Sequence, residues 1–141
     1  MRKEPKWLSK AAVLAIHERL IAQHGGPPGL LDEGRLDAPL GGPRNRFAYE
    51  EADIFRLAAA YAFALTKNHP FKDGNKRVAL TVAGVFLELN GFRLDAPEHE
   101  AAATMLALSK SELDEVGFAG WLRGSSSPTR AARLRRQSRK R

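Results

Sequence analysis

The chain has 141 residues, a length typical of one domain. A domain of this length can form a core that is stable without disulfide bonds or metal ions. Its hydrophobic fraction of 43% is ordinary for a globular protein, and the absence of cysteine excludes disulfides and thiolate metal sites. The charged N-terminus lacks an apolar segment behind it, and no run of about 18 apolar residues occurs. We therefore expect no secretory signal and no membrane span, and a cytoplasmic location.

The net charge of +7 belongs to the C-terminal segment. Residues 124–141 contain six Arg, one Lys and no acidic residue, whereas residues 1–123 contain 16 basic and 16 acidic residues. The segment is rich in Ser and Arg and poor in apolar residues, so we expect a disordered, solvated tail. The alternative is a contact with nucleic acid or another acidic partner, which the neutral body would not provide.

The first part of the chain predicts one helix followed by a long loop. Apolar residues recur at helical spacing over residues 10–24, with Ser9 as the N-cap and Gly25-Gly26 as the stop. Residues 25–49 hold half of the prolines and many of the glycines. They predict a loop with one short helix around residues 33–38.

Two strongly apolar helices are expected next, over about residues 50–68 and 75–90. Both are apolar almost all round, which is typical of central helices in a bundle. Pro70 ends the first, and Gly91 suits the end of the second. Because only a short loop joins them, the two helices should pack antiparallel.

The remainder predicts a short extended piece and two further helices. Residues 92–95 can be extended, Pro97 opens a helix that continues to about Ser109, and Ser111 and Asp114 form a capping pattern for a last helix to about Arg123. No long strand pattern occurs, so the fold class is all-α. We expect one domain over residues 1–123, followed by the basic tail over residues 124–141.

The segment from His69 to Arg77, HPFKDGNKR, joins the two apolar helices and holds the candidate active site. The N-terminus of a helix binds anions through unpaired N–H groups and its dipole. Gly74 lets the backbone approach a ligand, and Asn75 can cap the helix or present its amide. Lys76 and Arg77 place two cations there. The pattern predicts a phosphate site formed by these four residues.

Three more residues of the segment suggest chemistry. Asp73 offers the hard oxygen ligand that Mg²⁺ prefers. His69 carries the side chain whose ordinary pKa lies nearest neutrality, so it suits a general base. Phe71 should turn inward and anchor the loop. Each residue alone has a structural explanation, and it is their combination in one short loop that favours an enzyme. We expect the remaining histidines, at positions 17, 24 and 99, to be structural or exposed.

The segment resembles the motif of the Fic/Doc superfamily, H-x-F-x-D/E-G-N-G-R-x-x-R, and more closely its Doc branch, the death-on-curing toxins, with N-K-R at its end. The likeness extends over about Trp7–Arg123 and includes HERLIAQHGGPPGLLDEGRLDAPLGGPRNRFAYE before the loop and ALTVAGVFLELNGFRL after it. It implies a compact all-α bundle with the active-site loop between two central antiparallel helices. Only the tail lies outside it.

Two departures from the general motif matter for the reaction. Lys76 replaces the second glycine and Leu80 replaces the last arginine, the residues with which AMP-transferring Fic enzymes hold phosphates. The resemblance to Doc implies that ATP binds turned around, with its γ-phosphate at the catalytic histidine. It implies a protein kinase that phosphorylates a threonine of elongation factor Tu and so stops translation.

The resemblance also assigns roles. His69 would remove the proton of the threonine hydroxyl and Asp73 would hold Mg²⁺. The phosphate site at Gly74–Arg77 would stabilise the transferred group, with Lys76 and Arg77 counted as catalytic. The family pattern further suggests Pro43–Glu50 as a flap that positions the target.

Restraint of such a toxin should come from a separate Phd-like antitoxin. The internal inhibitory motif of some Fic proteins, S/T-x-x-x-E-G/N, has its nearest candidate at Ser111–Glu115, and Val116 breaks the pattern. Three alternatives to the kinase remain open. They are an AMP transferase on the same fold, a non-catalytic nucleic-acid-binding protein that uses the tail, and a degenerate Fic-fold protein that only binds.

Overall fold

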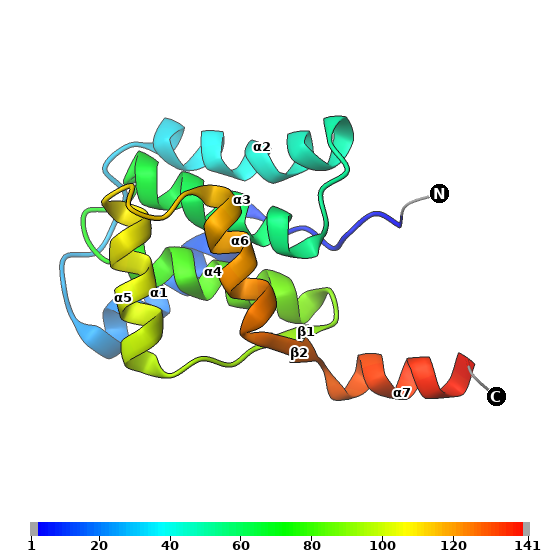
Figure 1. The fold of residues 1–141 in the computed structure, drawn as a ribbon. Helices are drawn as coiled ribbons and strands as arrows, with labels where there is room; N and C mark the ends of the chain where they lie inside the picture. The colour runs from blue at the N-terminus through cyan, green and yellow to red at the C-terminus, as the bar shows by residue number, and fades with distance from the viewer. Residues whose placement is uncertain (1–2, 140–141) are drawn as a thin grey trace.

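The structure is a computed structural model, and it describes residues 3–139. Helices make up most of the fold (Figure 1). Within these residues the elements are α1 (Lys10–His24), α2 (Glu33–Tyr49), α3 (Ile54–Asn68), α4 (Asn75–Leu89), β1 (Phe92–Leu94), α5 (Glu98–Ser109), α6 (Glu115–Gly124), β2 (Ser126–Pro128) and α7 (Arg130–Arg139). The expected all-α class is confirmed, with one small two-stranded sheet added to it. No helix in the described range is long and apolar enough to cross a membrane.

The centre of the bundle is the pair α3 and α4, which the sequence predicted as an antiparallel pair. Tyr61 and Leu65 of α3 are fully buried, as are Val82 and Phe86 of α4. The helices α2 and α6 pack on α3, while α1 packs on α4 and α5 contacts both. The active-site loop thus joins the two most deeply buried helices of the fold.

The first helix begins and ends where the sequence predicts. The Ser9 side chain accepts a hydrogen bond from the Ala12 N–H at 3.1 Å, and Gly25 follows the last turn with a φ of 81°. Val13 and His17 are its buried residues. This helix therefore brings a buried histidine towards the start of α4.

The prediction of a loop with one short helix over residues 25–49 is wrong, because residues 33–49 form one continuous helix, α2. Asp32 caps it by accepting from the Gly34 N–H at 2.7 Å, and Pro39 and Pro43 lie inside it. Both prolines are buried, together with Leu36. Burial of this face against α3 offsets the backbone hydrogen bonds that the two prolines remove.

The expectation of disorder for the tail is also wrong over the described residues. The extended piece predicted at residues 92–95 is β1, and it pairs antiparallel with Ser126–Pro128 of the tail, with Arg93 opposite Ser127. The helix α7 follows directly. None of its residues is buried, so backbone pairing rather than a hydrophobic core holds this segment to the body.

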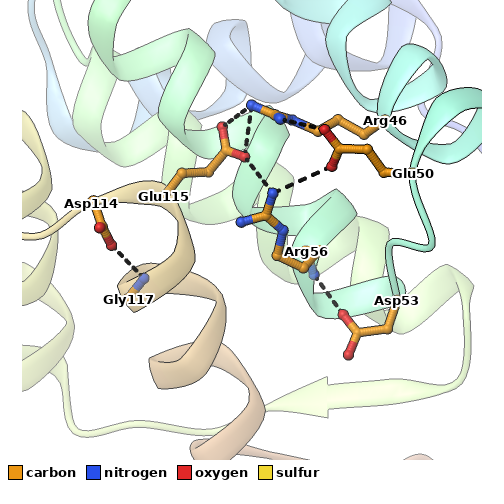
Figure 2. A network of polar contacts seen from close by, with 7 residues as sticks. All are labelled: Arg46, Glu50, Asp53, Arg56, Asp114, Glu115 and Gly117. Carbon is orange, nitrogen blue, oxygen red and sulfur yellow. Dashed lines mark hydrogen bonds and ion pairs between the residues drawn. The ribbon is translucent and has the colours of Figure 1, made fainter.

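Helices α5 and α6 agree with their predicted positions within a few residues. The cap of α6 is Asp114, whose carboxylate accepts from the Gly117 N–H at 2.6 Å (Figure 2). Ser111 has a φ of 63° and lies in the preceding turn. Phe118 and Leu122 of α6 are fully buried and join the core formed by α3 and α4.

Candidate active site

The loop between α3 and α4 is held by a short backbone pairing with residues 29–31. The Leu31 N–H donates to the Pro70 carbonyl at 2.8 Å, and the Lys72 N–H donates to the Gly29 carbonyl at 3.2 Å. Leu30 and Phe71 face each other in this antiparallel bridge. The segment between α1 and α2 thus fixes the path of the active-site loop.

Phe71 anchors the loop, as the sequence predicted. Its side chain is 1% exposed and stacks on the His17 ring, with centroids 3.8 Å apart and planes inclined by 8°. His17 Nε2 also lies 3.0 Å from the Asp73 carbonyl oxygen, so this nitrogen donates. His17, which we expected to be structural or exposed, therefore supports the site. In the sequence, this role is indicated only by the position of a polar residue on the buried face of α1.

Asn75 closes the loop from inside instead of presenting its amide to a ligand. Its side chain is 6% exposed, accepts from the Phe71 N–H at 3.0 Å and donates to the Phe71 carbonyl at 2.9 Å. The side-chain amide is thereby used within the protein. Any contact of Asn75 with a phosphate has to come from its backbone N–H.

His69 lies at the end of α3 with one ring nitrogen fixed. Its backbone is left-handed, with φ 49° and ψ 58°, and its side chain is exposed. Nδ1 lies 3.1 Å from the Thr66 carbonyl, which can only accept, so Nδ1 carries the proton. Nε2 then has a lone pair and is free to accept a proton from a substrate.

The N-terminus of α4 keeps its backbone donors available. Gly74 is the N-cap, with a φ of 80°, and no side chain of the described residues accepts from the first N–H groups. A φ of this kind favours glycine, which gives a conformational reason for a glycine at this position. The unpaired N–H groups and the helix dipole make this end of α4 suited to binding an anion.

A cleft of about 650 Å³ opens at the start of α4. Its lining residues come from the loop, from α4 and from the region of α5, namely Lys72, Asp73, Gly74, Asn75, Lys76, Arg77, Leu80, Ala96, Glu98, Ala101, Ala102 and Met105. No salt bridge within residues 3–139 neutralises the three cations among them. The cleft therefore combines three cations that form no salt bridge, the carboxylates of Asp73 and Glu98, and a largely apolar wall.

The structure brings together the predicted phosphate-site residues 74–77 and Asp73 around this cleft. His69 is not among the lining residues, although it borders the same loop. The wall contributed by α5, with Ala101 and Met105, was not found from the sequence. A small-residue helix far along the chain gives no local indication that it faces the loop.

Asp73 fits a magnesium ion bound together with phosphates. Its carboxylate borders the cleft and approaches Gly26, where an added Cβ would lie 2.5 Å from Oδ2. No group of three or more His, Cys, Asp or Glu side chains among the described residues could hold a metal alone. Mg²⁺ commonly binds one or two carboxylates and takes its other ligands from phosphates and water, so one carboxylate beside an anion site suffices.

The stretch Pro43–Glu50 does not fit the role of a flap beside the loop. Pro43 lies ten residues beyond Glu33, about 15 Å along α2 from the end that adjoins the loop. Instead, Arg46 bonds Glu50 at 3.1 Å and Glu115 at 3.0 Å, as Figure 2 shows. The segment that borders the active-site loop is residues 29–31.

Comparison with known proteins agrees with this site. A model of the Fic/DOC family matches residues 7–87, which include α1 and the whole loop. This chain belongs to the Fic/DOC family. Within the family its relatives lie in the Doc branch. "Protein kinase doc" of Escherichia phage P1 is 42% identical over 93 residues, covering 64% of this chain and 74% of that protein. "Toxin Doc" of Mycolicibacterium smegmatis (strain ATCC 700084 / mc(2)155) is 33% identical over 98 residues, covering 65% and 75%.

Membership of the Fic/DOC family gives the two motif departures a structural setting. Lys76 and Leu80 both line the cleft, and they lie one turn apart on α4. A long cation therefore occupies the place of a glycine, and an apolar side chain occupies the place of an arginine. The family match ends within α4, so α5, α6 and α7 lie beyond the matched residues.

Proposed function

We propose that this protein is a toxin of a toxin–antitoxin system that transfers the γ-phosphate of ATP to a threonine of elongation factor Tu. The names of the phage P1 and M. smegmatis relatives support a kinase and a toxin. The observation that carries the proposal is the cleft at the N-terminus of α4, where Lys76 and Arg77 lie beside free backbone donors and Asp73. The site of action would be the cytoplasm, where translation takes place.

His69 is the proposed general base. The Thr66 carbonyl holds the proton on Nδ1, which leaves Nε2 to take the proton from the threonine hydroxyl as the hydroxyl oxygen attacks the γ-phosphorus. The exposed position of the ring at the end of α3 allows a protein substrate to reach it. The leaving group is the β-phosphate oxygen of ADP, which departs as the new P–O bond forms.

Lys76, Arg77 and the first N–H groups of α4 would stabilise the charge on the transferred phosphoryl group. Gly74 allows the backbone to approach the phosphate oxygens. Asp73 would hold Mg²⁺, which when bound neutralises charge on the phosphates. His17 would act as a positioning residue, because its hydrogen bond to the Asp73 carbonyl fixes the backbone of that ligand.

The choice of phosphoryl transfer over AMP transfer rests on Lys76 and Leu80. An AMP transferase of this family needs a small residue and a cation at these positions to seat the α- and β-phosphates. Here the small residue is replaced by a long side chain, and the cation is replaced by leucine. With ATP turned around, the γ-phosphate would lie at His69, where the Lys76 ammonium would stabilise it, and no phosphate would depend on a cation at position 80.

Mass spectrometry of elongation factor Tu after incubation with this protein, ATP and Mg²⁺ tests the proposal. The expected product carries one phosphate on a threonine. His69→Ala should abolish it, while His99→Ala, a matched change of an exposed histidine outside the cleft, should preserve it. Equal melting temperatures of the two variants exclude misfolding as the cause. An AMP adduct, or a product that persists with His69→Ala, would overturn the proposal.

We further propose that a separate antitoxin restrains the protein. Lys67 donates a hydrogen bond to the Ser111 hydroxyl, and Glu115 pairs with Arg46 and Arg56 at 3.0 and 3.6 Å (Figure 2). A glutamate fixed in this way is not free to enter the cleft. Expression of the protein alone should arrest growth, and coexpression with a Phd-like antitoxin should relieve the arrest through a stable complex. Unimpaired growth without a partner would contradict this.

A further inference from the structure

We propose that α7 is a binding site for duplex DNA, which it contacts through phosphates on both sides of the major groove. All five arginines of the described helix are exposed, at positions 130, 133, 135, 136 and 139. Two more basic residues, Lys140 and Arg141, follow in the sequence. The helix therefore carries five of the seven basic residues that give the chain its net charge of +7.

The arginines of α7 have no acidic partners within the described part of the chain. None of the salt bridges or side-chain hydrogen bonds there involves them. A surface arginine on an ordinary helix is often paired with a carboxylate three or four residues away, but this segment contains no acid at all. The charge of α7 is thus available to an external anion.

The distribution of charge around α7 indicates what kind of anion fits. Successive residues of a helix are about 100° apart, so Arg130, Arg133, Arg136 and Arg139 follow one another round the helix in steps of about 60°, and Arg135 lies about 40° beyond Arg139. Together the five arginines cover about 220° of the circumference. A flat acidic surface would meet only some of these groups. The major groove of B-DNA is about 12 Å wide, admits one helix and has phosphates along both edges. A helix that is basic on several sides suits this groove.

The same distribution disfavours a membrane or an apolar groove. Leu134 is the only large apolar residue of α7, and it is 53% exposed. A helix that lies on a membrane needs a continuous apolar face, which one leucine and two alanines do not provide. An apolar groove would likewise have nothing to bury.

α7 is attached so that its direction is fixed. Only Thr129 separates it from β2, and the Thr129 N–H donates to the Gly91 carbonyl at 2.9 Å. The Thr129 hydroxyl caps the helix by accepting from the Ala132 N–H at 3.1 Å. Figure 1 shows the helix projecting from the body at this point. The body thus presents α7 as a protruding element open on most of its circumference.

Internal repulsion gives α7 a reason to bind a polyanion. Arg130, Arg133, Arg136 and Arg139 repeat every three residues, and like charges at this spacing destabilise a helix. A ten-residue helix without buried residues gains little from packing. Phosphates along the groove would neutralise these charges, so DNA should increase the helical content of this segment.

DNA on α7 would leave the active site accessible. The helix is tied to Gly91, beyond the C-terminal end of α4, whereas the cleft lies at the N-terminal end. The 15 residues of α4 separate the two by about 22 Å. DNA binding and the proposed kinase activity should therefore be separable by mutation, and failure of either proposal would leave the other standing.

The test is fluorescence anisotropy of a labelled mixed-sequence DNA duplex of about 20 base pairs, titrated with the full chain at several salt concentrations. Five phosphate contacts predict a slope of log K against log salt of about −4.5, or a loss of affinity of about 500-fold between 50 and 200 mM salt. Replacement of Arg133, Arg136 and Arg139 by Gln should reduce the slope to about −1.8.

The matched control removes three cations from the body, with Gln at Arg19, Arg35 and Lys110, all exposed. This variant has the same net charge as the α7 variant and should keep the wild-type slope. Equal loss in the two variants would overturn the proposal, since the binding would then follow net charge alone. Tighter binding of a duplex RNA or of anionic vesicles than of DNA would also overturn it.

Discussion

Replacing Asn75 by Asp tests whether the side-chain amide closes the loop or contacts a phosphate. The change preserves size and keeps an acceptor for the Phe71 N–H, but it removes the donor to the Phe71 carbonyl. A buried carbonyl left unpaired costs about 1–3 kcal/mol. The dipole at the N-terminus of α4 favours the new carboxylate by about 0.5–1 kcal/mol and offsets part of this cost.

The expected net destabilisation is about 1.3 kcal/mol, equivalent to a fall in melting temperature of about 5 °C for a domain of this size. Thermal and chemical denaturation followed by circular dichroism measure it. Asn68→Asp is the control, because Asn68 is exposed and donates to the Ala64 carbonyl at 2.9 Å. It should lower the melting temperature by only about 2–4 °C. An Asn75→Asp variant with no larger fall and a selective loss of ATP affinity would refute the loop-closing role.

Two further predictions concern Gly26, which lies beside Asp73, and the pH dependence of the stabilisation by Asp53. Gly26→Ala should raise the Mg²⁺ concentration needed for half-maximal activity, because its Cβ would lie 2.5 Å from Asp73 Oδ2, whereas Gly25→Ala, with a similar φ and open space, should not. An equal effect in a magnesium titration of both would contradict this. Burial opposes ionisation of Asp53, but a backbone N–H of α3 and the Arg123 guanidinium lower its pKa overall. The ionised Asp53 carboxylate therefore stabilises the folded state at pH values above its ordinary pKa. This stabilisation is lost as the pH falls through the lowered pKa that Asp53 has in the folded protein. Asp53→Asn should therefore lower the melting temperature at pH 7 more than at pH 3, and the reverse order would exclude the effect.

Local signals in the sequence sufficed for the central helices and the loop between them. Continuous apolar helices, a proline after the first and a glycine before the second are properties of neighbouring residues. The structure has them at these places, although α3 begins at Ile54 and not near residue 50. The anchoring role of Phe71 followed from the same reasoning. The cation pair, Asp73 and the glycine were predicted to share one site, and they border one cleft.

The parts that the sequence did not predict depend on distant contacts. The prolines of α2 indicate a loop until the burial of Pro39 and Pro43 against α3 is known. His17 gains its role only because Phe71, more than 50 residues away, stacks on it. The tail contains almost nothing apolar, so its order depends on the pairing of residues 126–128 with 92–94. The flap at Pro43–Glu50 was predicted from the family pattern alone. In the structure these residues lie in the part of α2 that runs away from the active-site loop.

The central claim is that the loop transfers the γ-phosphate through His69, and parallel labelling tests it most directly. Elongation factor Tu is incubated with the protein, Mg²⁺ and ATP labelled at either the α- or the γ-phosphorus. We predict that only γ-label enters the factor, that His69→Ala abolishes the transfer and that His99→Ala does not. Transfer of α-label, or γ-label transfer that survives His69→Ala, would contradict the account.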